Sequence, residues 1–513
     1  MNRTGLIFVI GLILILIALY FQYCNPSSNP CENFYEASPE EQMECLQDSF
    51  ITGEFYLIFP DTVECPSFDL AWYEGRSLSP SEQECQARLQ LVKDIIDLGV
   101  RTKRRCGCSL WLFNVGNDSL VHFEETILAV QSQVPPTGNQ GSGIFGRNIP
   151  MDLGFPKDFP ATEIDSPDFR VRGWLAEIPQ NQRYAVDSLR YAYLSAKAQL
   201  PPGVPDTLSP PLGLPNRDFV KVGILDMGMN YENPNLGDLI WVNPTRGLQT
   251  CYSSYRGGYN STDTNPLDLL DYTGHGTHIA GIITMQGRET RANPGGAITP
   301  QEYEDLRILP VKMTIEDALQ SDLFSAICAI RYAIAQDVDV MNLSWGFTYP
   351  ETPEALGMVL QEAKKAGILV VASAGNDSIN IDKALFWPAG FSVDPAYDHV
   401  ISVAALNADE TQLGRSNYGE QAVQIAAPGT CICSYGLQAG EMRMGNGTSM
   451  AAPFVTRYAA LLMMRNPTWT YQDVKAHILA EANTLSITGE NYPRIKIPHE
   501  GALTDECASI TCP

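Results

Sequence analysis

The sequence is poor in positive charge. Its 513 residues include 34 Lys and Arg against 59 Asp and Glu, which gives a formal net charge of −25 at pH 7. A chain of this charge repels phosphate backbones and anionic lipid surfaces, so nucleic acid is excluded as an expected partner. The sequence also lacks internal repeats and low-complexity segments. Its 18% charged and 44% apolar residues, with 41 Gly and 35 Pro, favour an ordered globular protein over a disordered or fibrous one. The length leaves room for roughly three domains.

The N-terminal stretch from Gly5 to Tyr23 has no charged residue and consists mostly of Leu, Ile, Val and Phe. About 20 apolar residues are enough to cross a bilayer as a helix. Arg3 before the stretch and acidic residues after it favour a cytoplasmic N-terminus. Residues 1–24 are therefore predicted to be a transmembrane helix that anchors the chain at the cell membrane in a single pass, with the remainder on the extracytoplasmic side. The alternative is a cleaved signal peptide and a secreted protein, although no small-x-small site precedes Cys24.

Thirteen cysteines agree with export, because disulfides persist in oxidising compartments. Cys328 lies in an apolar helical stretch, where a single thiol behaves as a small hydrophobic side chain. If Cys328 is free, the other twelve cysteines can form up to six bridges, whose connectivity the sequence does not determine. A zinc site at Cys106-Gly-Cys108 or Cys431-Ile-Cys433 is disfavoured, because a single intervening residue is not the usual spacing and no His is nearby.

A small cysteine-bearing α+β module is predicted for residues 25–150. Its pattern indicates strand, helix, strand and helix in turn, at residues 53–60, 81–98, 108–115 and 120–134. Residues 151–217 are interpreted as a connector that holds a helix near 183–199 and a linker with six prolines between positions 201 and 215.

Residues 218–495 are predicted to form the larger module, and residues 496–513 a C-terminal tail with two cysteines. Near-continuous apolar runs, typical of strands buried on both faces, occur at Val220–Leu225, Ile308–Met313, Val338–Leu343 and Ile368–Ala372. Helical patterns lie between these runs, at about residues 276–284, 315–336 and 353–366. The alternation predicts an α/β fold with a doubly wound parallel sheet.

Four polar residues stand at the predicted ends of strands or helices: Asp226, His275, Asn376 and Ser449. Each has an ordinary explanation by itself, as a helix cap or a turn residue. Together, the order Asp, His, Ser along the chain matches one of the known serine-hydrolase triads and differs from the orders in chymotrypsin and the α/β-hydrolases. Ala451 also stands where the GxSxG motif of the α/β-hydrolases requires Gly.

The motifs around these residues resemble those of subtilisin-like serine peptidases over residues 219–483. HGTHIAG, which begins at His275, is similar to the family's His motif, and GTSMAAP around Ser449 is similar to its Ser motif. The resemblance implies a serine endopeptidase that cleaves protein or peptide substrates through an acyl-enzyme intermediate. It implies no required cofactor and allows calcium as a structural ion, for which the acidic loop 263–271 is a candidate without the spacing of an EF-hand.

The resemblance also implies a role for each residue. Ser449 attacks the peptide carbonyl, His275 accepts and then donates the proton, and Asp226 holds the imidazole. The side-chain amide of Asn376 and the Ser449 backbone N–H bind the oxyanion. The walls of the substrate cleft are expected at Ser344, Trp345, Gly346, Ala374 and Gly375.

Several alternatives stay open. Trp345 either narrows the cleft or packs in the core. A non-catalytic binding protein, or an esterase, on the same fold is also compatible with the sequence. The module at residues 25–150 is either a propeptide-like domain that is removed on activation or a permanent stalk. Met227 stands after Asp226 where the family carries a small hydroxylated residue, so Met227→Ser is expected to be tolerated.

Overall fold

The computed structural model describes most of residues 219–494 and parts of residues 54–152. The described ranges are 54–59, 70–97, 100–106, 110–114, 144–147, 150–152, 219–231, 233–237, 239–241, 257–262, 269–271, 273–284, 302, 305–314, 320–407, 415–437, 441–487 and 490–494. The predicted membrane helix, the predicted helices at 120–134 and 183–199, the Pro-rich linker and the tail lie outside them. Within the described ranges, no helix is both long and apolar enough to cross a membrane.

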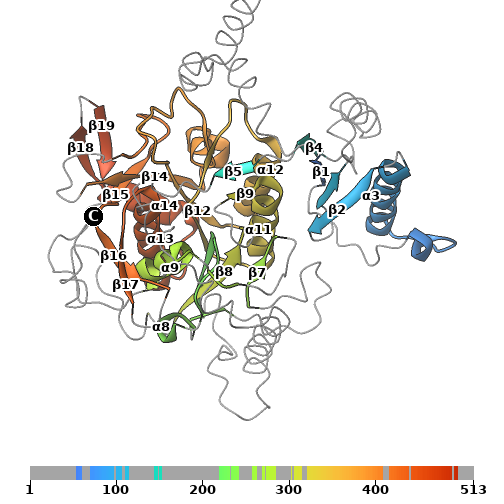
Figure 1. Cartoon of the computed structure of the whole chain (residues 1–513), viewed down its shortest axis with the longest axis horizontal. Helices are drawn as coiled ribbons and strands as arrows, with labels where there is room; N and C mark the ends of the chain where they lie inside the picture. Colours follow the sequence, from blue (N-terminus) through green and yellow to red (C-terminus); the bar gives the residue numbers. More distant parts are fainter. Residues whose placement is uncertain are drawn as a thin grey trace, which may run out of the picture. The chain divides into compact units, whose positions relative to one another are not determined.

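A nine-stranded sheet forms the centre of the larger module, in the order β18-β19-β15-β14-β12-β10-β6-β8-β7 (Figure 1). Its strands are β6 (Val220–Asp226), β7 (Tyr259–Asn260), β8 (Leu306–Lys312), β10 (Val340–Leu343), β12 (Leu369–Ser373), β14 (Val400–Leu406), β15 (Ile425–Pro428), β18 (Asn483–Ile487) and β19 (Glu490–Arg494). Every pair is parallel except β18 with β19. The predicted parallel α/β sheet is therefore confirmed.

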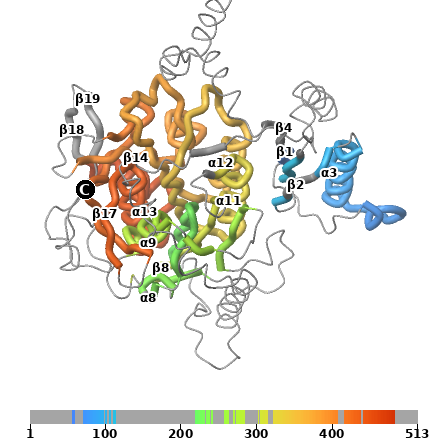
Figure 2. The backbone as a smooth tube through the Cα atoms, in the orientation of Figure 1, coloured from blue at the N-terminus to red at the C-terminus, as the bar shows by residue number. Residues whose placement is uncertain are grey.

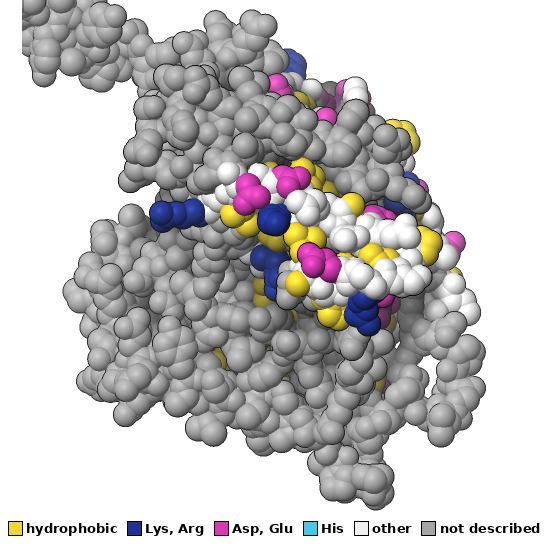
Figure 3. Space-filling model, turned by 90° about the vertical axis from the view of Figure 1, so that its right-hand side faces the viewer, with side chains coloured by type: hydrophobic (Ala, Val, Ile, Leu, Met, Phe, Trp, Pro, Cys, Tyr) yellow, Lys and Arg dark blue, Asp and Glu magenta, His cyan; other side chains and the backbone are white. Residues whose placement is uncertain are grey.

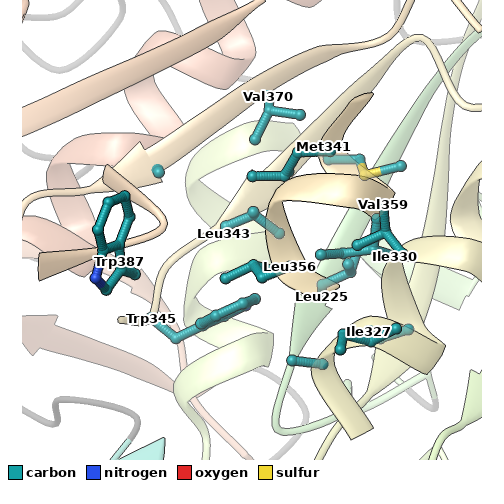
Figure 4. Packing of buried hydrophobic residues seen from close by; sticks show 14 of the residues in the cluster. Leu225, Ile327, Ile330, Met341, Leu343, Trp345, Leu356, Val359, Val370 and Trp387 are labelled. Carbon is teal, nitrogen blue, oxygen red and sulfur yellow. The ribbon is translucent and has the colours of Figure 1, made fainter. Parts of the chain in front are cut away.

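Helices cover both faces of this sheet. One face packs against α9 (His275–Thr284), α13 (Thr448–Arg465) and α14 (Tyr471–Glu481), and the other against α11 (Leu323–Ala335) and α12 (Glu354–Lys365). Val340 and Val371 belong to the core that includes residues of α9 and α13. Their strand neighbours Met341 and Val370 belong to the core that includes residues of α11 and α12 (Figure 4). Because successive side chains of a strand point to opposite faces, both must be apolar when both faces are covered.

The helix predicted over residues 315–336 begins later than expected, at Leu323. Residues Gln320–Asp322 form a short strand, β9, and the Asp322 side chain caps the helix by accepting a hydrogen bond from the Ser325 N–H at 2.7 Å. The prediction of this boundary was wrong because hydrophobic periodicity does not separate a short strand from the helix that follows it directly.

Part of the smaller module is a four-stranded antiparallel sheet in the order β2-β3-β1-β4. Its elements are β1 (Glu54–Ile58), the 3-10 helix η4 (Leu70–Tyr73), α3 (Pro80–Asp97), β2 (Arg101–Cys106), β3 (Leu110–Asn114) and β4 (Ile144–Arg147). The sequence did not predict strands β2 and β4. The β2 sequence, RTKRRC, shows no apolar alternation, which is compatible with its place at the edge of the sheet.

In the view from the right of Figure 1, the described surface mixes acidic and basic side chains among hydrophobic ones (Figure 3).

The two faces of this small sheet have different partners. Leu57 and Trp111 pack in a core with α3. Tyr56 and Leu112, on the opposite face, belong to the same core as residues of α11 and α12. The guanidinium of Arg331 on α11 donates a hydrogen bond to the Phe59 carbonyl at 2.6 Å.

A disulfide joins the two modules. Cys106 of β2 is bonded to Cys328 of α11, with the two Cα atoms 5.7 Å apart. The suggestion that Cys328 is free is therefore wrong, because the docked sheet brings a second cysteine to it from 222 positions away in the sequence. The zinc alternatives are excluded as well, since Cys106, Cys431 and Cys433 are all in disulfides. A further strand, β5 (Pro150–Asp152), pairs antiparallel with β9.

Candidate functional site

The candidate catalytic residues lie at the ends of three elements. Asp226 is the last residue of β6, His275 is the first residue of α9, and Ser449 is the second residue of α13. The helices α9 and α13 pack side by side (Figure 2). The carboxyl ends of parallel strands and the start of helices are where open α/β sheets bind ligands, because backbone N–H groups point outward there.

Asp226 and His275 form a buried pair. The Nδ1 atom of His275 lies 2.7 Å from Oδ1 of Asp226, and the two residues are 3% and 2% exposed, respectively. A carboxylate accepts only, so Nδ1 carries a proton and Nε2 is the basic nitrogen. Burial disfavours the imidazolium, but the charge and hydrogen bond of Asp226, with the charge of Asp271, more than offset it, so the pKa of His275 is raised above its ordinary value.

The Met227 backbone N–H, rather than a side-chain hydroxyl, supports the carboxylate of Asp226. It donates to Oδ1 of Asp226 at 2.8 Å. The Met227 side chain is 2% exposed and packs in the core on the α11 and α12 side of the sheet. The Thr273 hydroxyl oxygen lies 3.3 Å from the Met227 sulfur. The expectation that serine is tolerated at this position therefore conflicts with the packing.

Ser449 contacts one predicted wall of the cleft. Its hydroxyl donates to the Ser344 carbonyl at 3.1 Å, and the Ser344 hydroxyl donates to the Ser449 carbonyl at 2.8 Å. The pair of bonds fixes the segment at Ser344 against the start of α13.

The other predicted wall contacts Thr448. The Thr448 N–H and hydroxyl donate to Oδ1 of Asn376 at 2.8 and 3.1 Å, and the Gly375 N–H donates to the Thr448 hydroxyl at 3.1 Å. Because Thr448 holds the amide oxygen of Asn376, the amide nitrogen is directed away from Thr448. The structure thus brings both wall segments to the N-terminus of the helix that carries Ser449.

The Trp345 side chain packs in the core. It is 2% exposed and belongs to the core that includes Leu343 and Leu356, beside which it lies in Figure 4. Of the two open alternatives, the core position is the one observed, and the side chain does not narrow the cleft.

Asp271 is a further residue of the candidate site, and the motifs around Asp226, His275 and Ser449 did not predict it. Its carboxylate accepts hydrogen bonds of 2.8–2.9 Å from the N–H and hydroxyl of Thr273, the N–H of Gly274, and the N–H and hydroxyl of Thr277. It thereby satisfies N–H groups at the start of α9, the turn that presents His275. An acidic residue shortly before a helix is the sequence signal that could have found it.

The hydrogen bonds of Asp271 also affect whether this residue can bind calcium. The carboxylate of Asp271 is committed to protein donors, so this residue does not fit as a ligand in the acidic loop. Across the part of the chain that the structure describes, no group of three or more His, Cys, Asp or Glu side chains is placed to hold a metal ion.

His278 lies one turn after His275 on α9 and contacts two backbone carbonyls. Its Nε2 lies 3.1 Å from the Ile432 carbonyl and 3.2 Å from the Arg443 carbonyl. Burial lowers the pKa of His278 to about 4. This neutral ring joins α9 to the hairpin of β16 (Ile432–Tyr435) and β17 (Met442–Gly445).

Comparisons with known proteins identify the family of the larger module. A family model described as the Subtilase family matches residues 217–495. Subtilisin E of Bacillus subtilis (strain 168) is 31% identical over 270 residues, which cover 52% of this chain and 61% of the relative. Halolysin of Haloferax mediterranei is 34% identical over 289 residues, 56% of this chain and 49% of the relative.

Among solved structures, a cold adapted subtilisin-like serine proteinase is 22% identical, with 57% of this chain and 95% of that chain covered and a TM-score of 0.41. The chain spans 61% of the length of subtilisin amylosacchariticus and of subtilisin E, and 84% of the length of the subtilisin of Bacillus pumilus. Because the family model covers more than half of the sequence, this protein belongs to the subtilase family.

Proposed function

We propose that this protein is an exported serine endopeptidase that hydrolyses peptide bonds with Asp226, His275 and Ser449. The observation that carries the proposal is the buried 2.7 Å contact between Asp226 and His275, beside the helix that begins at Thr448. Membership of the subtilase family supports it.

In the proposed mechanism, Nε2 of His275 takes the proton of the Ser449 hydroxyl as the oxygen bonds to the peptide carbonyl carbon. The negative oxygen is stabilised by the amide N–H of Asn376 and the backbone N–H of Ser449, where the positive end of the α13 dipole adds to the field. His275 then gives its proton to the leaving amine, and water releases the acyl group by the same steps. Asp226 stays ionised and stabilises the imidazolium.

The proposed location is the cell membrane, with residues 1–24 as a single-pass anchor and the peptidase outside the cytoplasm. The disulfide between Cys106 and Cys328 supports an oxidising compartment. One relative is named a cell wall-associated protease of Bacillus subtilis. Secretion after cleavage of the N-terminal segment is the alternative, and protease treatment of intact cells distinguishes the two.

The test of the proposed activity compares Ser449→Ala and His275→Ala with the parent. Each variant is expected to lose nearly all peptide hydrolysis and, for Ser449→Ala, all labelling by a fluorophosphonate, because the members of a triad act as a unit. Ser392→Ala, which removes a buried hydroxyl bonded to the Ala422 carbonyl away from the site, is the matched control and should keep both. A Ser449→Ala protein that cleaves peptides at the parent rate would exclude the proposal, and a parent that is neither labelled nor active would favour a binding protein.

A further inference from the structure

The ring of Phe386 touches both walls of the predicted cleft at glycine residues. A Cβ atom placed on Gly346 would lie 2.2 Å from Cε1 and 2.5 Å from Cζ of this ring. A Cβ atom placed on Gly375 would lie 2.8 Å from Cζ and 3.0 Å from Cε2. These distances are shorter than van der Waals contact, so the ring occupies the space that a side chain at Gly346 would fill. At Gly375 it shares that space with Nδ2 of Asn417, which would lie 2.3 Å from the Cβ atom.

This space adjoins the reacting groups. The wall that holds Gly346 is bonded to Ser449 through Ser344, and the wall that holds Gly375 continues into Asn376. In the proposed mechanism, Ser449 attacks a substrate carbonyl whose oxygen points at Asn376. The Cα atom of the substrate residue that contributes this carbonyl then lies between the two walls. The side chain on that Cα, on the acyl side of the cleaved bond, is therefore directed toward the slot that Phe386 enters.

The position of Phe386 is fixed by backbone pairing. Its strand β13 (Phe386–Trp387) pairs with β11 (Phe347–Thr348), which follows Gly346 directly. The indole N–H of Trp387 donates to the Tyr349 carbonyl at 3.0 Å, and Phe386 itself is only 5% exposed. The ring is thus held in the slot by the sheet and by the core around it.

The wall at Gly375 is also held in place by backbone conformation and hydrogen bonds. Gly375 has φ +98°, a conformation that favours glycine, so the wall stays without a side chain at this point. The side chain of Asn417 donates to the Ala374 carbonyl at 2.9 Å and accepts from the Asp377 N–H at 2.8 Å. These bonds hold the wall at Gly375 in place.

We propose that Phe386 closes this slot and restricts the residue on the acyl side of the cleaved bond to Gly, Ala or Ser. The inference rests on the proposed peptidase function and names its substrate class. A large side chain would have to displace a buried aromatic ring, whereas a hydrogen, a methyl or a hydroxymethyl group would not.

The experiment uses the full chain and a peptide series that differs only at the residue on the acyl side. The parent is expected to cleave the Ala peptide with a kcat/KM at least about tenfold above that for the Phe peptide. Phe386→Ala opens the slot and should shift this ratio toward Phe by at least about tenfold. Phe386→Leu is the second variant, with a smaller shift expected in the same direction.

Phe391→Ala is the matched control. Phe391 is a buried ring 4.5 Å from the Trp387 ring, and it is not among the atoms nearest to either cleft glycine. This variant should unfold more readily than the parent and keep the parent's ratio. A control that shifts the ratio as far as Phe386→Ala would overturn the assignment, because the effect would then come from general loosening.

Labelling by a fluorophosphonate distinguishes failure of the proposed peptidase function from failure of the slot inference alone. A parent that is not labelled overturns the peptidase function and this inference with it. A parent that is labelled but prefers Phe, Tyr or Leu overturns this inference alone, as does a folded, labelled Phe386→Ala protein with the parent's ratio.

Discussion

At the residue scale, the side chain of Met227 contributes to core packing, although the family motif has a small hydroxylated residue at this position. The sequence motif indicates that a hydroxyl is missing beside Asp226, but a backbone N–H already supports that carboxylate. The thioether instead fills the core beneath the site.

Met227→Ser is therefore expected to lower the free energy of unfolding by about 2 kcal/mol or more, as for other truncations of buried methionine. The N–H bond to Asp226 remains, so kcat per folded molecule should change little. Urea unfolding measures the free energy of unfolding. The initial rate at saturating peptide, divided by the concentration of active sites from titration, gives kcat per folded molecule. Met227→Leu, which nearly conserves volume, should stay within about 1.5 kcal/mol of the parent. Equal unfolding midpoints for parent and Met227→Ser would contradict the packing argument.

In the proposed mechanism, the protonation of His275 sets the acid limb of the pH profile of activity. Only the neutral ring can accept the proton of Ser449, and the pKa of His275 is raised, so kcat/KM should fall on acidification with a midpoint above pH 6.5. Asp226→Asn removes the charge that raises this pKa and leaves the burial that lowers it. The midpoint should then move to lower pH while the rate falls by roughly 10⁴-fold. A parent midpoint at or below 6.5 is the result that would refute this reading.

At the scale of elements, the start of α9 depends on Asp271. This carboxylate binds N–H groups of the first turn and contributes to the raised pKa of His275. Asp271→Ala is expected to lower stability by about 2 kcal/mol, at the upper end for loss of a cap, and to reduce kcat/KM. As a positioning residue, it should also shift the acid limb to lower pH. Asp322→Ala removes the cap of α11 and is the control, with a loss of stability but no shift of the limb. Identical pH profiles for parent and Asp271→Ala would reduce its role to that of a structural cap.

The sequence predicted those elements whose pattern is set by burial alone. The strands β6, β8, β10 and β12 are covered on both faces, so each is an apolar run that stands out in the chain. The edge strand β2 and the three-residue β9 have no such run, and they are specified by pairing partners distant in sequence.

The same distinction applies to the candidate site. Asp226, His275, Asn376 and Ser449 stand in local motifs, so the sequence was sufficient to select them. The role of Phe386 depends on its contact with Gly346 and Gly375, which no local pattern records.

At the scale of the whole molecule, the smaller module is part of the folded unit rather than an independent attachment. One face of its sheet shares a core with α11 and α12, and the bridge between Cys106 and Cys328 is buried within that core. A propeptide-like domain and a permanent stalk remain the two interpretations. In either case, cleavage of the backbone between the modules leaves the disulfide between Cys106 and Cys328 intact.

The bridge between Cys106 and Cys328 should keep the two modules together after the backbone between them is cut. A chain cut within residues 151–217, by itself or at an inserted recognition site for a specific peptidase, should remain one species in denaturing electrophoresis without reductant. Addition of reductant should separate it into two, because the bridge between Cys106 and Cys328 is then opened. The double variant Cys106→Ser, Cys328→Ser should separate without reductant, and its cut form should lose the smaller module in denaturant. Intact mass spectrometry identifies the pieces. A cut parent chain that separates without reductant would show that this disulfide does not hold the modules together, and the smaller module could then be released as an ordinary propeptide is.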